Sequence, residues 1–198
     1  MRFIEEESDN MKESFDPSLI ERLESPERKK ELPASSLLKM LQVDGEVDVL
    51  DIGAGTGYFS IPAASLTTGT VYALDTEPAM LDMMRGRTQE QGITNVKVME
   101  GVLEQLPFQD ETVDRVIASL ILHITDRLEE SISQIARVMR PGGRCLCLEW
   151  QEAPSEKRVP KPNRVDPQVL KALLEQAGLQ VDGIRYPTER HYLIIASK

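Results

Sequence analysis

Three glycines at alternate positions, Gly53, Gly55 and Gly57, carry the strongest chemical signal in this chain. They stand where a short apolar run gives way to a helical pattern. Glycine adopts positive φ readily and lets a ligand approach backbone N–H groups without a Cβ in the way. Asp75 ends the next apolar run, and a carboxylate there can accept hydrogen bonds from both hydroxyls of a ribose. The spacing therefore predicts a site for a ligand that contains a nucleoside.

A nicotinamide dinucleotide is one candidate ligand for such a loop. Its fingerprint requires a further glycine at the position that Tyr58 occupies here. The chain also lacks the Tyr-x-x-x-Lys pattern that donates protons in many reductases. An oxidoreductase is thus an alternative that the sequence disfavours, and only this alternative predicts binding of a nicotinamide cofactor.

The pattern around these residues alternates between strand and helix. The apolar run 47–52, closed by Gly53, is typical of a strand buried on both faces. A helix begins at Ser35, and further helices are expected over 58–66, 78–91, 126–139 and 167–176, with strands over 70–74, 95–99, 113–119, 145–150, 181–186 and 191–196. Alternation predicts a parallel sheet with helices on both faces. The last two strands are separated only by Pro187–Arg190, so they must be antiparallel neighbours.

The segment Val49-Leu50-Asp51-Ile52-Gly53-Ala54-Gly55-Thr56-Gly57-Tyr58 resembles motif I of the class I S-adenosylmethionine-dependent methyltransferases. The stretches Glu104–Phe108, Val113-Asp114 and Arg137–Gly143 look like the small-molecule, methyltransferase type 11-like branch of that family. The resemblance covers roughly residues 35–198. It implies an α/β, Rossmann-like, seven-stranded, mostly parallel sheet with helices on both faces and an antiparallel last strand.

The resemblance also implies the cofactor S-adenosylmethionine, the product S-adenosylhomocysteine and a small-molecule methyl acceptor. Asp75 would hold the ribose hydroxyls, and Asp51 would support the loop or the amino group. Val102 stands where the family commonly has an acidic residue for the adenine amino group, so backbone groups of Val102 and Leu103, or the Glu104 side chain, would have to replace it. Carried over by position, the cofactor-binding residues are Asp51, Gly53, Ala54, Gly55, Thr56, Gly57, Asp75, Thr76, Met80, Val102, Leu103 and Ser119.

Methyl transfer from a sulfonium is an in-line displacement that depends mainly on alignment of donor and acceptor. If a general base takes part, His123 is the candidate, because it follows the fourth strand at the carboxyl edge of the sheet. Glu149 and Trp150 could shape the substrate pocket, and His191 is expected to be structural. A non-catalytic cofactor-binding sensor or assembly subunit is the alternative, which Val102 and the lack of a clear base favour.

Composition limits the partners of the chain. Its 198 residues indicate one methyltransferase domain, residues 34–198, preceded by an N-terminal arm, residues 1–33. The formal net charge of -10 argues against nucleic acid as a partner. The apolar positions Leu19, Ile20 and Leu23 would make the arm a lid or a homodimer contact.

Compartment and metal content are also expectations from sequence. The chain has no apolar run of about 18 residues that could span a membrane. Met1–Asn10 lacks the apolar core of a signal peptide, so a cytoplasmic protein is expected. Cys145 and Cys147 lie in an apolar run and are interpreted as reduced packing residues. With only two histidines in the chain, no metal site is expected.

Overall fold

The structure, a computed structural model, describes residues 20, 21, 23–151 and 164–198. Within these ranges one sheet has seven strands in the order β3-β2-β1-β4-β5-β7-β6. Their bounds are β1 Val49–Ile52, β2 Val71–Asp75, β3 Val96–Glu100, β4 Val113–Ser119, β5 Met139–Trp150, β6 Gln180–Thr188 and β7 His191–Ser197. Strand β7 is antiparallel to both β5 and β6, whereas β1 to β5 are parallel to one another. The predicted sheet and its terminal hairpin are confirmed.

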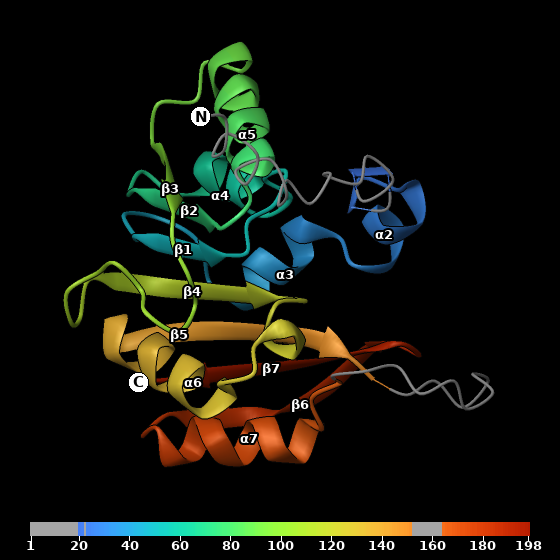
Figure 1. Cartoon of the computed structure of the whole chain (residues 1–198), viewed down its shortest axis with the longest axis vertical. Coiled ribbons are helices and arrows are strands. Elements are labelled where there is room, and N and C mark those ends of the chain that lie inside the picture. Colours follow the sequence, from blue (N-terminus) through green and yellow to red (C-terminus); the bar gives the residue numbers. More distant parts are fainter. Residues whose placement is uncertain (1–19, 22, 152–163) are drawn as a thin grey trace, which may run out of the picture.

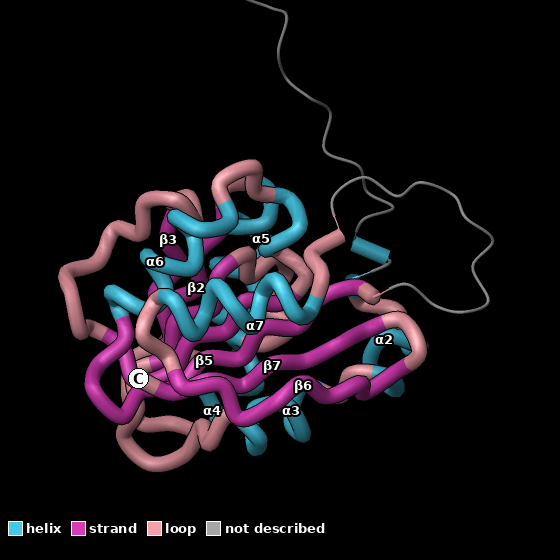
Figure 2. The backbone as a smooth tube through the Cα atoms, turned by 90° about the horizontal axis from the view of Figure 1, so that it is seen from below, coloured by secondary structure: helices cyan, strands magenta, loops and turns pink. Residues whose placement is uncertain are grey.

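Helices cover both faces of the sheet (Figure 2). Helices α3 (Ala34–Met40) and α4 (Ser60–Leu66) pack with Val49, Ile117 and Leu193. Helix α5 (Pro78–Glu90) lies on the same face of the sheet. Its Met84 packs with Ala73 of β2, and Ala73 faces the same side as Val71, which packs with α3 and α4. Helices α6 (Leu128–Val138) and α7 (Pro167–Gln176) bury Ile132, Ile135, Leu170 and Leu174 on the opposite face. Alternate residues of each strand therefore face different helices, which explains the continuous apolar runs.

Three elements differ from the sequence prediction, one of them a short 3-10 helix over Leu122–Ile124 that was not expected. Helix α2 (Pro26–Glu31) was not expected; it buries none of its own residues, so its sequence carries no apolar periodicity. Strand β5 begins at Met139 instead of residue 145. The Pro141-Gly142-Gly143 stretch, which looks like a turn and in which Gly142 has a φ of 78°, is held in the strand because Gly142 donates to Lys198 O at 2.8 Å and Lys198 donates back to Gly143 O at 3.0 Å. That pairing depends on the far end of the chain.

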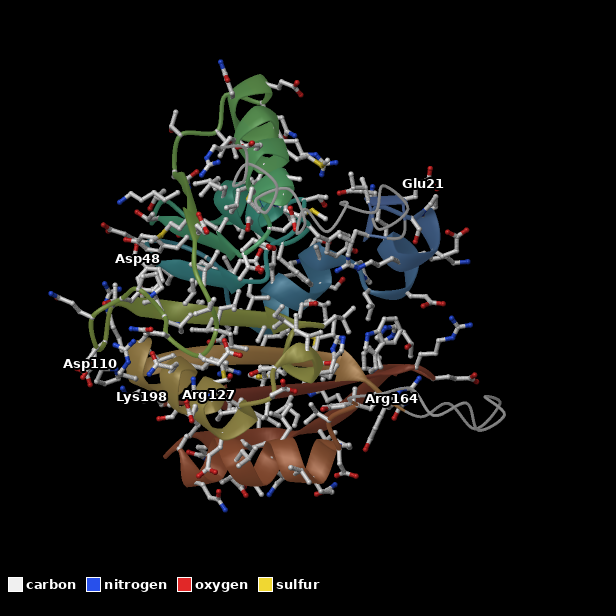
Figure 3. The ribbon with its side chains drawn as sticks, in the orientation of Figure 1. Glu21, Asp48, Asp110, Arg127, Arg164 and Lys198 are labelled. Carbon is white, nitrogen blue, oxygen red and sulfur yellow. The ribbon has the colours of Figure 1, made fainter. Side chains whose placement is uncertain are left out.

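The parallel strands bring distant segments to one edge of the sheet. The residues that end or directly follow β1, β2, β4 and β5 are Gly53, Asp75, Ser119 and Trp150. Figure 3 labels Asp48 near the opposite, amino edge, whereas Arg164 lies toward the carboxyl ends of β4 and β5. At the amino edge Arg140 bridges Asp48 at 3.1 Å and Asp114 at 2.7 Å, which ties β1, β4 and β5 together. The candidate site lies at the carboxyl edge of the sheet.

The sequence also made predictions about the two cysteines, about membrane-spanning segments and about the arm. Cys145 and Cys147 are free and buried, as predicted. Among the described helices, none is both long and apolar enough to cross a membrane. Leu19 and most of the loop Gln151–Asp166 lie outside the described residues.

Candidate active site

The glycine loop after β1 is shaped by Gly53. This residue has φ of 68°, and a Cβ added to it would come within 2.7 Å of Ile121 Cδ1. Its N–H donates to Leu74 O at 2.8 Å, which joins the loop to the end of β2. A side chain at this position would both strain the backbone and collide with a branched neighbour. The glycine therefore lets Ile121, in the turn after β4, pack directly against the loop.

Asp75 connects the glycine loop to the next strand. Its Oδ2 accepts a hydrogen bond from the Gly55 N–H at 2.7 Å, and its Oδ1 accepts one from the Glu77 N–H at 3.0 Å. Each carboxylate oxygen has two lone-pair sites, so each can accept one further hydrogen bond. The geometry thus fixes the carboxylate and leaves it able to bind a pair of hydroxyl groups.

A cavity of about 180 Å³ opens beside Asp75. Val102, which the sequence places where an acidic residue is common in the family, lines this cavity and is 45% exposed. Glu104 also lines it, and its Oε1 accepts from Thr125 Oγ1 at 2.5 Å. The walls are mainly apolar with a few polar groups, as in sites for aromatic ligands. The lining residues are Ile52, Gly53, Asp75, Thr76, Gly101, Val102, Leu103, Glu104, Ile121, Ile124 and Thr125.

Asp51, the acidic residue of the loop motif, is buried on β1. Its Oδ2 accepts from Ser60 Oγ at 2.6 Å, a contact with the first residue of α4. Burial raises the pKa of Asp51 to about 7; the hydrogen bond from Ser60 opposes this effect, and the nearby charge of Asp75 adds to it. Asp51 therefore links β1 to the start of α4, on the two sides of the glycine loop. Its carboxyl group stays protonated at mildly acidic pH.

His123 and Glu149 form a pair at the carboxyl ends of β4 and β5. Glu149 is fully buried, its Oε2 lies 2.8 Å from His123 Nδ1, and its Oε1 accepts from the Leu122 N–H at 2.7 Å. The carboxylate can only accept, so Nδ1 carries the proton and Nε2 keeps a free lone pair. The turn that carries His123 follows Leu120, whose φ of 56° is uncommon for a residue with a side chain.

The described end of the N-terminal arm contacts the glycine loop. Glu24 Oε1 accepts from Thr56 Oγ1 at 2.5 Å and from Arg87 Nη1 at 2.6 Å, while Lys29 lies 3.1 Å from its other oxygen. Burial alone would raise the pKa of Glu24, but the hydrogen bonds from Arg87, Thr56 and Lys29 outweigh it and lower that pKa to about 2. Leu23 Cδ1 would lie 3.6 Å from a Cβ at Gly55. We refer to Glu24, Thr56 and Arg87 as the clasp.

The predicted site residues fall into two groups. Gly53, Asp75, Thr76, Val102 and Leu103 line the cavity together. The other seven are not lining residues. Asp51 and Gly55 make the contacts described above, Gly57 donates to Ala54 O at 2.9 Å, and Thr56 belongs to the clasp. Ala54 packs against Ala73 and Met84, Met80 is buried in α5, and Ser119 Oγ is buried without a partner among the described residues.

Sequence reasoning missed the partners that these residues meet through the fold. Glu149 was expected at most to shape the pocket, and Glu24 was not singled out. The only sequence signal for Glu149 is its position at the end of a strand, next to the strand that leads to His123.

Comparisons with known proteins identify the family. A family model described as "Methyltransferase domain" matches residues 50–147. The chain is 37% identical over 106 residues to a malonyl-[acyl-carrier protein] O-methyltransferase of Methylococcus capsulatus, covering 53% of this chain and 38% of that protein. It is 33% identical over 145 residues to the ubiquinone/menaquinone biosynthesis C-methyltransferase UbiE of a Marinomonas species, covering 71% and 57%. The chain thus spans less than two thirds of either relative.

Among solved structures, a SAM dependent methyltransferase from Aquifex aeolicus has the same fold, with a TM-score of 0.79 and 24% identity over 92% of this chain and 98% of that one. The carboxyl edge also fits the cofactor of these enzymes: the cavity suits an adenosine, and the Asp75 carboxylate that borders it can accept from ribose hydroxyls. By its sequence match and its fold, the chain belongs to the class I S-adenosylmethionine-dependent methyltransferases.

Proposed function

We propose that this chain transfers a methyl group from S-adenosylmethionine to a small-molecule acceptor. The observation that carries the proposal is the cavity that Asp75 shares with the turn containing His123: Ile121, Ile124 and Thr125 of that turn line it. Asp75 and the turn that carries His123 thus border one space at the carboxyl edge, although the His123 side chain is not among the residues that line it.

The cofactor is held by residues of three segments in this proposal. Asp75 accepts hydrogen bonds from the ribose hydroxyls, and the loop around Gly53 and Gly55 lies along the amino-acid portion. The adenine lies between Thr76 and Val102, where backbone groups of Val102 and Leu103 face its polar edge in place of an acidic side chain. When bound, S-adenosylmethionine supplies a methyl group on a positively charged sulfur that leaves as a neutral thioether.

His123 accepts a proton from the acceptor as the new bond to the methyl group forms. Its Nδ1–H is fixed by Glu149, which keeps Nε2 free to receive the proton and stabilises the resulting imidazolium. A cofactor sensor does not need a histidine oriented by a buried carboxylate, so the pair favours a catalyst. It also favours an acceptor that must lose a proton, such as a phenol, an amine or an acidic C–H group.

The relatives supply two acceptor chemistries for a test. Purified protein is incubated with S-adenosylmethionine and either a hydroquinone or a malonyl thioester, and formation of S-adenosylhomocysteine is measured by chromatography. The account predicts turnover with the hydroquinone, which loses a proton, and a drop in that turnover in His123→Ala. Turnover confined to the malonyl carboxylate, which loses none, would contradict the role of His123. No turnover, with cofactor binding intact, would favour the sensor.

A further inference from the structure

Arg28, in helix α2 of the arm, is held firmly yet lacks an anionic partner. Its guanidinium lies 4.2 Å from the centre of the Tyr58 ring, and its Nη1 donates to Leu23 O at 2.9 Å. Its Nε is buried with no hydrogen-bond partner, and within the described ranges no carboxylate pairs with it. Burial lowers the pKa of Arg28, which is consistent with a cation withdrawn from water.

A partly buried guanidinium without a counterion is costly, because desolvation is not offset by an ion pair. The charges of Asp51 and Glu24 offset this burial only in part: both raise the pKa of Arg28, but burial outweighs them, and each carboxylate is hydrogen-bonded elsewhere. Glu24 is engaged by Thr56 and Arg87, and Asp51 accepts from Ser60. The Tyr58 ring, over which Arg28 lies, is held in place because the Tyr58 hydroxyl donates to Leu32 O at 2.7 Å. The fold has oriented a cation and left it able to bind an anion from outside.

The location of Arg28 indicates which anion this is. Asp75 meets the glycine loop at Gly55, whereas Arg28 meets it at Tyr58, beyond the last glycine of the motif. Figure 1 shows α2 on the side toward which the β4 arrow points. A ligand whose ribose lies at Asp75 and whose other end follows the loop would therefore reach Arg28.

We propose that Arg28 binds the carboxylate at the methionine end of S-adenosylmethionine, an inference that rests on the proposed function. A planar guanidinium matches a carboxylate and can bind it with two parallel hydrogen bonds. The buried, unpartnered Ser119 Oγ lies on the same sheet face as Asp51, two residues beyond Ile117, the partner of Asp51 in the β1–β4 register. Ser119 offers a second donor at that end of the site.

Calorimetric titration with two ligands tests this proposal. S-adenosylhomocysteine carries the amino-acid end, and 5′-methylthioadenosine retains the adenosine and the thioether but lacks the carboxylate. In Arg28→Gln we expect binding of S-adenosylhomocysteine to weaken by about 10- to 100-fold. Binding of 5′-methylthioadenosine should stay within about twofold of wild type, which also shows that the variant is folded. Arg28→Lys keeps the charge, so its affinity for S-adenosylhomocysteine should lie between those of wild type and Arg28→Gln. The control is Arg85→Gln, which changes an exposed arginine on α5.

Each other outcome overturns the assignment in a recognisable way. Equal loss of both ligands in Arg28→Gln would mean that Arg28 only supports the arm. Unchanged affinity for both would mean that the carboxylate binds elsewhere. If the wild-type protein binds neither ligand, the proposed function itself fails, and that result is distinct from a failure confined to Arg28.

Discussion

At the scale of single residues, Asp75 joins the loop and the cavity, since its two oxygens accept from Gly55 and Glu77. We expect Asp75→Ala to weaken S-adenosylhomocysteine binding by about 1.5 to 3 kcal/mol, the usual scale for a hydrogen bond to a charged group. Calorimetric titration measures this, with the exposed Asp82→Ala as the control. An affinity equal to wild type would remove Asp75 from the site.

The pair of His123 and Glu149 makes a second prediction at this scale. We expect His123→Ala to lower turnover by about 100-fold while leaving the affinity for S-adenosylhomocysteine unchanged. Glu149→Gln can still accept the Leu122 N–H, but it lacks the charge that stabilises a protonated His123, so it should also lose turnover. Steady-state kinetics alongside titration separates these effects. Normal turnover in both variants would leave alignment of the reactants as the whole mechanism.

The sequence predicted the residues that lie close together along the chain. Gly53, Gly55 and Asp75 follow directly from strand ends, so their spacing alone brings them to one edge. Glu149 could not be paired with His123 from sequence, because the contact depends on the register of β4 against β5. Arg28 reaches the loop only because a helix without buried residues docks on Tyr58, and nothing in its own pattern indicates this.

At the scale of elements, the described part of the arm is fastened to the loop by the clasp. We expect Glu24→Gln to free this segment, since the neutral amide loses two ion pairs, at a cost of about 1 kcal/mol in stability at this partly exposed position. Hydrogen exchange of α2 should speed up, and S-adenosylhomocysteine should bind more weakly. Glu27→Gln, an exposed glutamate within α2, is the control.

The acid dependence of the clasp follows from the lowered pKa of Glu24. Because that pKa falls from 4.5 to about 2 on folding, the stabilisation is present above about pH 4.5 and is lost as the pH falls toward 2. Exchange in α2 that is identical in wild type and Glu24→Gln at neutral pH would show that the clasp does not hold the arm.

The helices and strands were mostly predictable because each has its own apolar period. In α6, Ile132 and Ile135 share one face, and the predicted range differs from the observed one only at the ends. The start of β5 was not predictable, since Pro141-Gly142-Gly143 is held in the strand only through its pairing with Lys198.

At the scale of the whole molecule, Asp51 and His191 give opposite pH dependences to the free energy of unfolding. Burial raises the pKa of Asp51 from 3.8 to about 7, so this contribution to stability falls as the pH rises from about 4 to 7. Burial lowers the pKa of His191 from 6.5 to about 4, so that contribution rises with pH over nearly the same interval. Each slope is at most about 1.4 kcal/mol per pH unit, and the two largely offset each other.

Asp51→Asn should reveal the contribution of His191. The amide can still accept from Ser60 but does not titrate, so the stability of this variant should rise between pH 4.5 and 6.5, where the wild-type curve is flatter. Urea unfolding at a series of pH values measures the slopes, with the exposed Asp126→Asn as the control. Parallel curves for Asp51→Asn and wild type would contradict the buried, protonated Asp51.

The topology of the whole chain was predictable because strand and helix alternate, and because the short link Pro187–Arg190 allows only an antiparallel hairpin. The contact between the described end of the arm and the glycine loop was not, because it depends on side chains such as Glu24 that meet the loop only in the folded state.

The central claim is that the carboxyl edge binds S-adenosylmethionine and not a dinucleotide. Isothermal titration of the purified protein with S-adenosylhomocysteine, with NADH in parallel, tests it most directly. The account predicts saturable binding of S-adenosylhomocysteine and no heat with NADH. Binding of NADH, or no binding of S-adenosylhomocysteine, would contradict the assignment of the glycine loop and Asp75.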